Sequence, residues 1–249
     1  MIAFAICVGS DAMLNRWALP GIARCAGPYA KVIERREQRS IFAAYNSILE
    51  EAALIQDLEF LVLLHDDTEI RDARLVDKLR ALFADGSVGV AGAIGARNVS
   101  SLAWWEADRR GWVSRDGLTH DEGPRIEDFG TATTEVDSVD GLFMALPAWT
   151  VRNVRFDERR YHGFHGYDTD YCFEVRARGR RVVVSHFDVH HHNASVGFAD
   201  RQGFLRDNIR WRAKWGFDSP VAVAPRLAAL SVRARASSVR RRALALVRR

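Results

Sequence analysis

The strongest constraint on the fold is a run of five apolar residues, 60–64 (FLVLL), that ends abruptly at His65-Asp66-Asp67. The run is too short for a helix and is apolar on both faces. It therefore predicts a central strand of a parallel sheet, which is covered on both sides. Ligands of such sheets bind beyond the carboxyl ends of the strands. The histidine and the two carboxylates are thus expected where such folds bind their ligands.

Alternating strand and helix patterns surround this run. Strands are expected at 2–8, 30–34, 87–95, 138–147 and 181–192, and helices after Ser40 as N-cap, after Asp72, at 167–179 and at 203–216. Residues 96–135 are expected to form loops and a hairpin. The alternation predicts an α/β fold with helices flanking a mostly parallel central sheet. Because no linker pattern interrupts residues 1–218, we expect one domain there.

Basic charge is concentrated at the C-terminal end. The formal net charge is +4, but residues 219–249 hold eight arginines and no acid, so the remainder carries about −4 (+4 minus 8). The body therefore gives no electrostatic reason to expect nucleic acid as a partner. Residues 219–249 mix arginine with leucine, valine and alanine. This mixture is typical of an amphipathic helix on an anionic membrane surface, and equally of a solvated chain end.

The cysteines and the apolar runs bear on localisation. Cys7, Cys25 and Cys172 are scattered and odd in number, which favours neither a zinc knuckle nor a disulfide framework. A reducing cytoplasm is therefore expected. No apolar run approaches 18 residues, and the first residues read as a strand rather than a signal peptide. We expect a cytoplasmic protein, with the inner face of the cell membrane as a second location.

The adjacent carboxylates Asp66 and Asp67 repel each other at a strand end unless a cation neutralises them. Mg²⁺ and Mn²⁺ take oxygen ligands and bridge to phosphate oxygens. A metal site is one interpretation, and capping of the following helix is the simpler one. A second acidic pair, Asp168 and Asp170, opens the helix predicted at 167–179. Residues two apart on a helix point in different directions. One carboxylate can therefore face a cleft as general base while the other favours the helix dipole.

The third cluster is the sequence HFDVHHH at 186–192. If this segment is extended, a period of two places His186, Asp188, His190 and His192 on one face and His191 on the other. Imidazole and carboxylate groups on one face can bind a metal. A structural hydrogen-bonding role is as consistent with the pattern as ligation is.

Taken together, the clusters resemble a family 2 glycosyltransferase of the GT-A fold, which is Rossmann-like, and more closely its small StrF-like branch. The matching pieces, in order, are AICVGSD, SIFAAYNSILEEA, FLVLLHDDTEI, VDGLFMALP, FDERRYHGFHGYDTDYCFEVRARGRRVVV and VHHHNASVG. No single piece is decisive, but their order and spacing match over roughly residues 2–200.

The resemblance implies a donor site built on an Asp-x-Asp motif that holds a divalent cation, Mn²⁺ or Mg²⁺, on the diphosphate of a nucleotide-sugar. Here the motif reads His65-Asp66-Asp67, so the first acid is replaced. Asp67 takes the position of the metal ligand, His65 that of a nucleotide contact, and Asp66 contacts the ribose or the metal's water shell. Asn46 matches a position that lines the nucleotide pocket, and Glu34 matches the acid that reads the base.

The remaining matches concern catalysis and closure of the metal site. Tyr167-Asp168 stands where the family has Glu-Asp or a similar pair, so the resemblance makes Asp168 the catalytic base. Asp140-Gly141 matches the segment beneath the sugar and the acceptor. His190, five residues before Ser195, matches the histidine that closes the metal site, and His192 is the second candidate for that role.

The implied activity is inverting transfer of a sugar from a UDP-, GDP- or dTDP-sugar to a hydroxyl of a sugar or lipid-linked acceptor, with envelope polysaccharide or glycolipid synthesis as its setting. A metal-dependent hydrolase built from the same residues is an alternative. No ligand pattern such as HExxH supports it. A catalytically inactive binding scaffold is the other alternative, since the first motif acid is lost. Three tryptophans, at 104, 105 and 112, either stack on a sugar or pack in the core.

Overall fold

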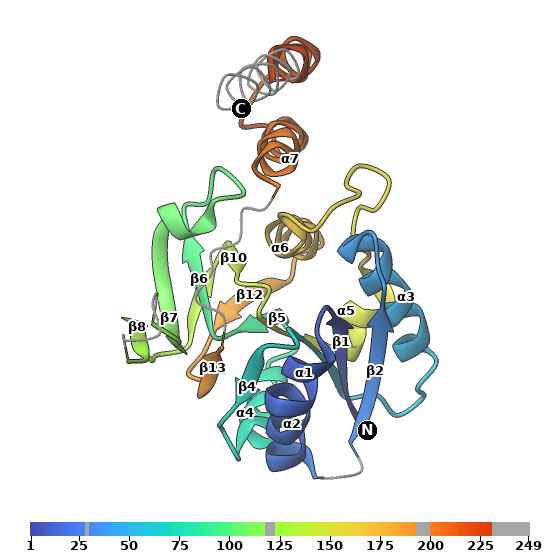
Figure 1. Ribbon diagram of the computed structural model, residues 1–249, viewed down its shortest axis with the longest axis vertical. Helices are drawn as coiled ribbons and strands as arrows, with labels where there is room; N and C mark the ends of the chain where they lie inside the picture. The colour runs from blue at the N-terminus through green and yellow to red at the C-terminus, as the bar shows by residue number, and fades with distance from the viewer. Residues whose placement is uncertain (28–29, 118–122, 193–199, 231–249) are drawn as a thin grey trace, which may run out of the picture.

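The fold is built around a seven-stranded sheet, seen in a computed structural model that describes residues 1–27, 30–117, 123–192 and 200–230 (Figure 1). Its strands run in the order β2 (Lys31–Arg36), β1 (Ile2–Val8), β3 (Phe60–Leu64), β11 (Phe143–Pro147), β5 (Val88–Gly92), β12 (Arg181–Val184) and β9 (Thr134–Val136). All of them except β11 and β9 are parallel to one another. The prediction of a mostly parallel central sheet is therefore confirmed.

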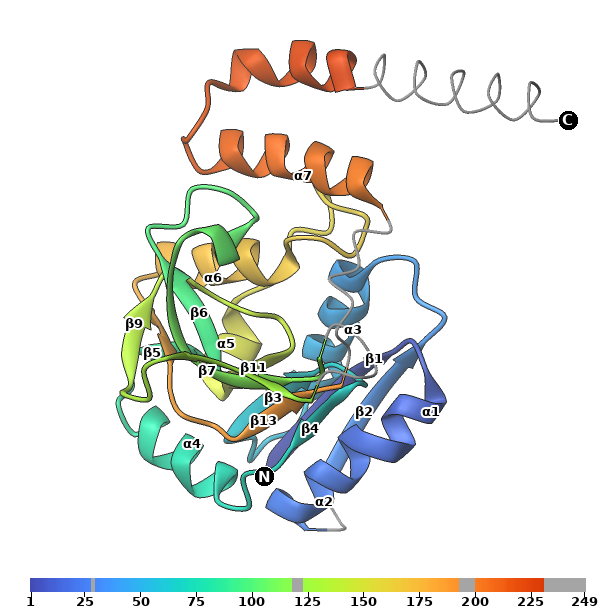
Figure 2. The same ribbon diagram turned by 60° about the vertical axis from the view of Figure 1, so that its left-hand side comes forward.

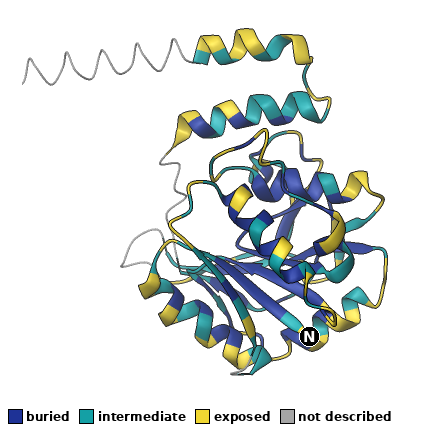
Figure 3. Cartoon of the chain, turned by 90° about the vertical axis from the view of Figure 1, so that its right-hand side faces the viewer, coloured by how far each residue is buried: buried dark blue, intermediate teal, exposed yellow. Residues whose placement is uncertain are grey.

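Helices cover both faces of this sheet, as Figures 1 and 2 show. On one face, α3 (Ile41–Ala53) packs on β1 and β2, α5 (Ala148–Asn153) on β3 and β11, and α6 (Tyr167–Ala177) on β5 and β12. On the other, α4 (Leu75–Phe83) packs Phe83 on Phe60 of β3. The strands between these layers are dark blue in Figure 3 because their side chains are buried. All five residues of β3 are buried, as an apolar run without a polar face requires.

A second, six-stranded sheet stands beside the carboxyl ends of the first. Its strands are β10 (Ser138–Val139), β6 (Ile94–Arg97), β7 (Asp108–Arg115), β13 (Val189–His191) and β4 (Thr68–Ile70), with β8 (Arg125–Phe129) paired to β7. β7 and β8 form the hairpin expected within residues 96–135. Because β4 and β13 pair directly, the residues that follow β3 lie beside the histidine run.

Three apolar runs predicted as single strands are each divided between the two sheets. Residues 87–95 become β5 and β6, residues 138–147 become β10 and β11, and residues 181–192 become β12 and β13. At one of these junctions the backbones pack closely, because a Cβ on Gly95 would lie 2.2 Å from the Ser138 carbonyl oxygen. Buried residues continue from β5 into β6, so hydrophobicity alone does not mark that crossing.

The predicted helices are present with small shifts in their ends. The helix after Ser40 is α3, although the Ser40 hydroxyl makes no cap hydrogen bond with any described residue. The helix expected at 203–216 is α7 (Arg201–Lys214), and the Asp200 side chain caps its N-terminus by accepting a hydrogen bond from the Gly203 nitrogen. Helical segments that the sequence did not suggest are α1 (Asp11–Met13), η1 (Leu14–Ala18), α2 (Leu19–Ala26), η2 (Trp104–Glu106), α5 (Ala148–Asn153) and η3 (Pro220–Ala222).

The C-terminal part of the chain is set off from the sheets. Helix α7 packs on α6 through buried Trp211, which lies edge-on to Phe173 at 4.8 Å between ring centroids. A further helical stretch, 223–230, lies beyond α7, on the side away from the sheets (Figure 2). Residues 231–249, which hold most of the arginines of the predicted basic tail, lie outside the described residues. Over the described ranges, no helix has the length and apolar character that crossing a membrane requires.

Candidate active site

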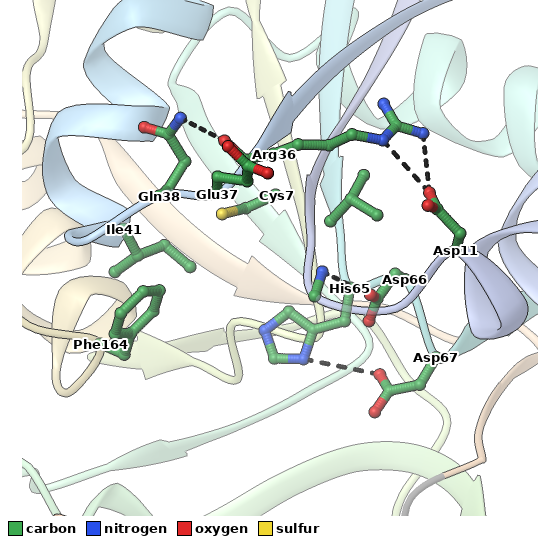
Figure 4. A pocket seen from close by; sticks show the side chains of 12 residues that line it. Cys7, Asp11, Arg36, Glu37, Gln38, Ile41, His65, Asp66, Asp67 and Phe164 are labelled. Atoms are coloured by element: carbon green, nitrogen blue, oxygen red, sulfur yellow. Dashed lines mark hydrogen bonds and ion pairs between the residues drawn. The ribbon is translucent and has the colours of Figure 1, made fainter.

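A cleft of about 540 Å³ opens at the carboxyl ends of β1, β2 and β3. Its lining residues are Cys7, Val8, Gly9, Asp11, Arg36, Glu37, Gln38, Ile41, His65, Asp66, Asp67 and Phe164. Figure 4 shows the Asp11–Arg36 ion pair across the cleft from the side chains of His65 and Asp67, with Ile41 and Phe164 forming an apolar edge. The cleft therefore lies at the carboxyl ends of the strands, where the apolar run 60–64 and its polar end predicted a ligand site.

Strand β3 delivers three polar side chains that diverge at its end. The Asp66 carboxylate turns toward β1 and accepts hydrogen bonds from the backbone nitrogens of Gly9 (2.7 Å) and Ser10 (2.6 Å). It thereby fixes the loop after β1 and still borders the cleft. The mutual repulsion expected of the adjacent carboxylates is reduced because Asp66 and Asp67 face different partners.

Asp67 lies beside two histidines, of which His65 also lines the cleft. Its Oδ1 is 3.2 Å from His191 Nε2 and 3.9 Å from His65 Nδ1. These three side chains form a group whose nitrogen and oxygen atoms could hold one metal ion. Burial lowers the pKa of His65, although the nearby Asp67 carboxylate opposes this. The His65 imidazole is therefore neutral near pH 7, as metal ligation requires.

The predicted alternation holds for His190, His191 and His192, whereas residues 185–188 are not part of a strand. The face that meets Asp67 is that of His191. His191 points to Asp67, whereas His190 and His192 lie together on the other side of β13, close to Asp116. The structure thus does not bring His190 or His192 to Asp67. The alternation itself was readable from the sequence. Which face meets β3 depends on the pairing of β13 with β4, which no local pattern reveals.

Arg115 connects His191 to Asp140 behind the cleft. The guanidinium donates to His191 Nδ1 (2.8 Å) and to the Asp140 carboxylate (2.8 Å). Burial would raise the pKa of Asp140, but the Arg115 charge outweighs it and holds that pKa below its ordinary value. Since a guanidinium only donates, His191 Nδ1 is an acceptor, and Nε2–H faces Asp67. Metal ligation through Nε2 requires the other neutral tautomer, in which the proton is on Nδ1. Arg115 then loses the hydrogen bond to His191 and keeps its ion pairs with Asp140 and Glu127.

Tyr167 and Gly141 hold His65 in place. The Tyr167 hydroxyl lies 2.6 Å from His65 Nε2. The tyrosine ring packs on Gly141, where a Cβ would stand 2.1 Å from the hydroxyl oxygen, so the position has no room for a side chain. Gly141, predicted to lie under the sugar, thus supports the residue that orients His65.

Asp168 is buried at the start of α6, beneath the segment that contains Gly141. Its carboxylate accepts from the backbone nitrogens of Gly141 (3.0 Å) and Thr169 (2.7 Å). Burial and the nearby Asp140 charge raise the pKa of Asp168 to about 7. Asp168 is outside the set of described residues that line the cleft, and its neighbour Tyr167 reaches the cleft residue His65.

The second acid of this helix, Asp170, holds α6 and α7 together. Its carboxylate accepts from Lys214 Nζ (2.8 and 2.9 Å) and from Trp215 Nε1 (2.9 Å), which tie α7 to α6. The two acids therefore have different partners, as the helical spacing predicted.

Two residues expected at the nucleotide lie elsewhere. Asn46 is buried, donates to the Phe156 carbonyl oxygen (3.0 Å) and accepts from the Phe156 nitrogen (2.8 Å). Both ends of its amide are used in joining α3 to that segment, so it does not face the cleft. Glu34 pairs with Arg36, and it is Arg36 that borders the cleft.

Nine lining residues were not predicted from the sequence, among them Arg36, Glu37, Gln38 and Phe164. The first three complete or follow β2, so the rule for carboxyl ends of parallel strands could have found them. Glu37 has a left-handed backbone (φ 56°), which is uncommon outside glycine and often marks functional sites. The tryptophans at 104, 105 and 112 are not among the described residues of the cleft.

The sequence of this chain is similar to those of known glycosyltransferase-like proteins. The family described as "Glycosyltransferase like family" matches residues 3–203. The streptomycin biosynthesis protein StrF of Streptomyces griseus is 37% identical over 223 residues, covering 88% of this chain and 76% of that protein.

Two solved structures share the fold. The mannosyltransferase PcManGT from Pyrobaculum calidifontis, in complex with GDP-Man and Mn²⁺, is 14% identical with a TM-score of 0.54, over 98% of this chain and 79% of that one. GalNAc-T7 with UDP, GalNAc and Mn²⁺ is 10% identical with a TM-score of 0.56, over 85% of this chain and 47% of that one. At these identities the likeness concerns the fold.

Proposed function

Because the chain belongs to the glycosyltransferase-like family, we propose that it transfers a sugar from a nucleotide-sugar to an acceptor hydroxyl, with inversion at the anomeric carbon. The observation that carries this proposal is the His65–Asp67–His191 group, of which His65 and Asp67 line a cleft beyond β1, β2 and β3. A cleft at these strand ends suits a nucleotide. UDP-, GDP- and dTDP-sugars are the candidate donors, and sugars or lipid-linked sugars are the candidate acceptors.

The donor set of this group fits a divalent cation. Asp67 offers a carboxylate oxygen, and His65 and His191 each offer an imidazole nitrogen within reach of it. Magnesium prefers oxygen ligands, so two imidazoles favour Mn²⁺ over Mg²⁺. The bound cation would neutralise charge on the departing diphosphate. We assign closure of this site to His191 rather than to His190 or His192.

The nucleoside would occupy the other end of the cleft. Ile41 and the half-exposed Phe164 offer an apolar edge on which a base or ribose can lie, and the nearby Gln38 and Glu37 offer polar contacts. Aromatic and aliphatic walls with a few polar groups are typical of small-molecule sites.

Asp168 would act as the general base. It would take the proton of the acceptor hydroxyl, the hydroxyl oxygen would form a bond to the sugar C1, and the bond from C1 to the diphosphate oxygen would break. A pKa of about 7 suits a base that works near neutral pH, because part of the carboxyl is ionised while it retains proton affinity. Its burial beside Gly141 would place proton transfer away from bulk water.

Release of nucleoside diphosphate tests this activity. The full chain would be incubated with Mn²⁺, a panel of UDP-, GDP- and dTDP-sugars and candidate hydroxyl acceptors. Acceptor-dependent release, with a product of inverted anomeric configuration by NMR, is the expected result. Asp67→Asn should abolish release, whereas Asp77→Asn, the same change on the exposed face of α4, should not. Release that ignores the acceptor would indicate a hydrolase, and a retained configuration would contradict the inverting mechanism.

We further propose that residues 1–218 form the catalytic domain and residues 219–249 a basic segment that contacts anionic membrane from the cytoplasmic side. The supporting features are the eight arginines of that segment and the position of residues 223–230 beyond α7. Such contact would suit a lipid-linked acceptor in envelope polysaccharide or glycolipid synthesis.

A further inference from the structure

A second group of potential ligands lies on the opposite face of β13 from the cleft. It consists of Asp116, directly after β7, and His190 and His192. The Asp116 Oδ1 atom is 2.8 Å from His190 Nε2 and 3.7 Å from His192 Nδ1. Two ligands of one tetrahedral zinc ion, each at 2.0–2.2 Å, stand roughly 3.3 Å apart. The three atoms therefore already have nearly the spacing of a shared ion.

The surroundings of His190 accommodate the tautomer that carries its proton on Nδ1. The Ser114 hydroxyl oxygen lies 3.3 Å from the Val189 carbonyl oxygen and 2.8 Å from His190 Nδ1, so a hydroxyl that donates to the carbonyl accepts from Nδ1–H. In the neutral imidazole, Nε2 is then a lone pair. That lone pair faces the Asp116 carboxylate at 2.8 Å. Two acceptors at this distance repel unless a cation or an added proton lies between them.

His192 repeats the arrangement. Its Nε2 contacts the Glu69 carboxylate (3.1 Å), which can only accept from Nε2–H when ionised, so Nδ1 is left as a lone pair toward Asp116. The ring is stacked on Trp17, with 3.5 Å between ring centroids and 10° between planes. Metal-ligating histidines characteristically hold their second nitrogen on a carboxylate, carbonyl or similar acceptor. Both histidines of this group are held in that way.

We propose that Asp116, His190 and His192 form a second metal site, distinct from the Asp67 site, that takes a transition-metal ion of the zinc class. Two imidazoles and one carboxylate suit Zn²⁺ better than Mg²⁺ or Ca²⁺. Three protein ligands leave one tetrahedral position for a further ligand, and the Asp116 side chain is half-exposed. The ion joins the end of β7 to β13 and so fixes the strand that carries His191.

Zinc titration of the full chain, without a histidine tag and after removal of metals by a chelator, tests this proposal. Asp67→Asn is used as the background so that the cleft site does not contribute. In that background one Zn²⁺ is expected to bind, and added Asp116→Asn should weaken binding at least 100-fold. Added Asp77→Asn, an equal charge change far from the group, should leave it unchanged. With Co²⁺ as probe, visible absorption of a nitrogen-ligated ion should appear and vanish with the same variants.

The variant His192→Gln is a second test of the same metal site, and it leaves the Asp116 carboxylate in place. It should also abolish the Co²⁺ absorption, while circular dichroism shows whether the chain remains folded. If Asp116→Asn and Asp77→Asn bind Zn²⁺ equally, the proposal is wrong, and the contacts among Asp116, His190 and His192 are hydrogen bonds without an ion. Because nucleotide plays no part in this experiment, its failure leaves the proposed transferase activity untouched.

Discussion

At the residue scale, the two positions that depart from the family pattern, His65 and Tyr167, contact each other. The pattern that the sequence resembles has an acid at the position of His65 and an acid at the position of Tyr167. In this chain the two replacements lie 2.6 Å apart as a hydrogen-bonded pair. A histidine and a tyrosine at these positions avoid further carboxylates next to Asp140 and Asp168. His65 was predicted as a nucleotide contact, and its partner could not be foreseen because 102 residues separate the two in sequence.

Replacing Tyr167 by phenylalanine tests this pair. The ring still packs on Gly141, but the hydrogen bond that orients His65 is lost. A hydrogen bond of about 1 kcal/mol corresponds to roughly fivefold weaker Mn²⁺-dependent nucleotide binding by calorimetry. The matched control is Tyr171→Phe on the same helix, whose hydroxyl makes no hydrogen bond with any residue that the structure describes. If both variants bind equally, Tyr167 does not position His65.

The pKa of Asp168 predicts the acid side of the pH profile. A general base must be ionised, and burial raises the pKa of this carboxyl to about 7. We therefore expect kcat/KM to fall about tenfold per pH unit below about pH 7 and to level off above it. Asp168→Asn should lower kcat by about 10²–10⁴-fold while nucleotide binding persists. A profile that stays flat down to about pH 5 would exclude Asp168 as the base.

At the element scale, the sequence identified elements better than it placed them. β3 follows from its unbroken apolar run, α3 from the apolar spacing after Ser40, and α6 from its acidic first turn and the glycine at 179. The division of 87–95, 138–147 and 181–192 between two sheets does not follow, because it depends on backbone contacts between segments distant in sequence. The same limit explains the histidine run. Period two separated His191 from His190 and His192, but only the tertiary pairing of β13 shows which face meets Asp67.

Gly95 tests the junction between the sheets. Alanine there would place a Cβ 2.2 Å from a backbone oxygen of β10, which cannot move aside as a flexible side chain could. Gly95→Ala is expected to lower the free energy of unfolding by about 1–3 kcal/mol in urea. Gly86→Ala is the control, because its Cβ would meet nothing within 4 Å. It should be neutral or stabilise by up to about 1 kcal/mol. Equal stability of the two variants would contradict the described junction.

At the scale of the whole molecule, charge and chemistry lie in different parts of the chain. The cleft and its candidate catalytic residues belong to the two-sheet body, while eight arginines lie in residues 219–249. Asp218 marks the boundary, pairing with Arg212 on one side and Arg226 on the other. A division of labour between donor chemistry and surface attachment is therefore consistent with the sequence and with the architecture.

Removal of residues 226–249 tests that division. The truncated chain should keep its nucleotide affinity and lose flotation with anionic liposomes, because all eight arginines are removed. Flotation of the full chain should weaken as salt is raised, since the attraction is screened. Neutral liposomes are the control. Equal flotation of the two chains on anionic vesicles would refute membrane contact through this segment.

Calorimetric titration of UDP, GDP and dTDP into the full chain, with and without Mn²⁺, tests the proposed metal–diphosphate site most directly. We predict that one nucleotide binds in a Mn²⁺-dependent way. Asp67→Ala and His191→Ala should each weaken this binding by at least tenfold, whereas Asp77→Ala should not. Nucleotide binding that ignores Mn²⁺, or that survives Asp67→Ala unchanged, would contradict the metal–diphosphate site at the end of β3.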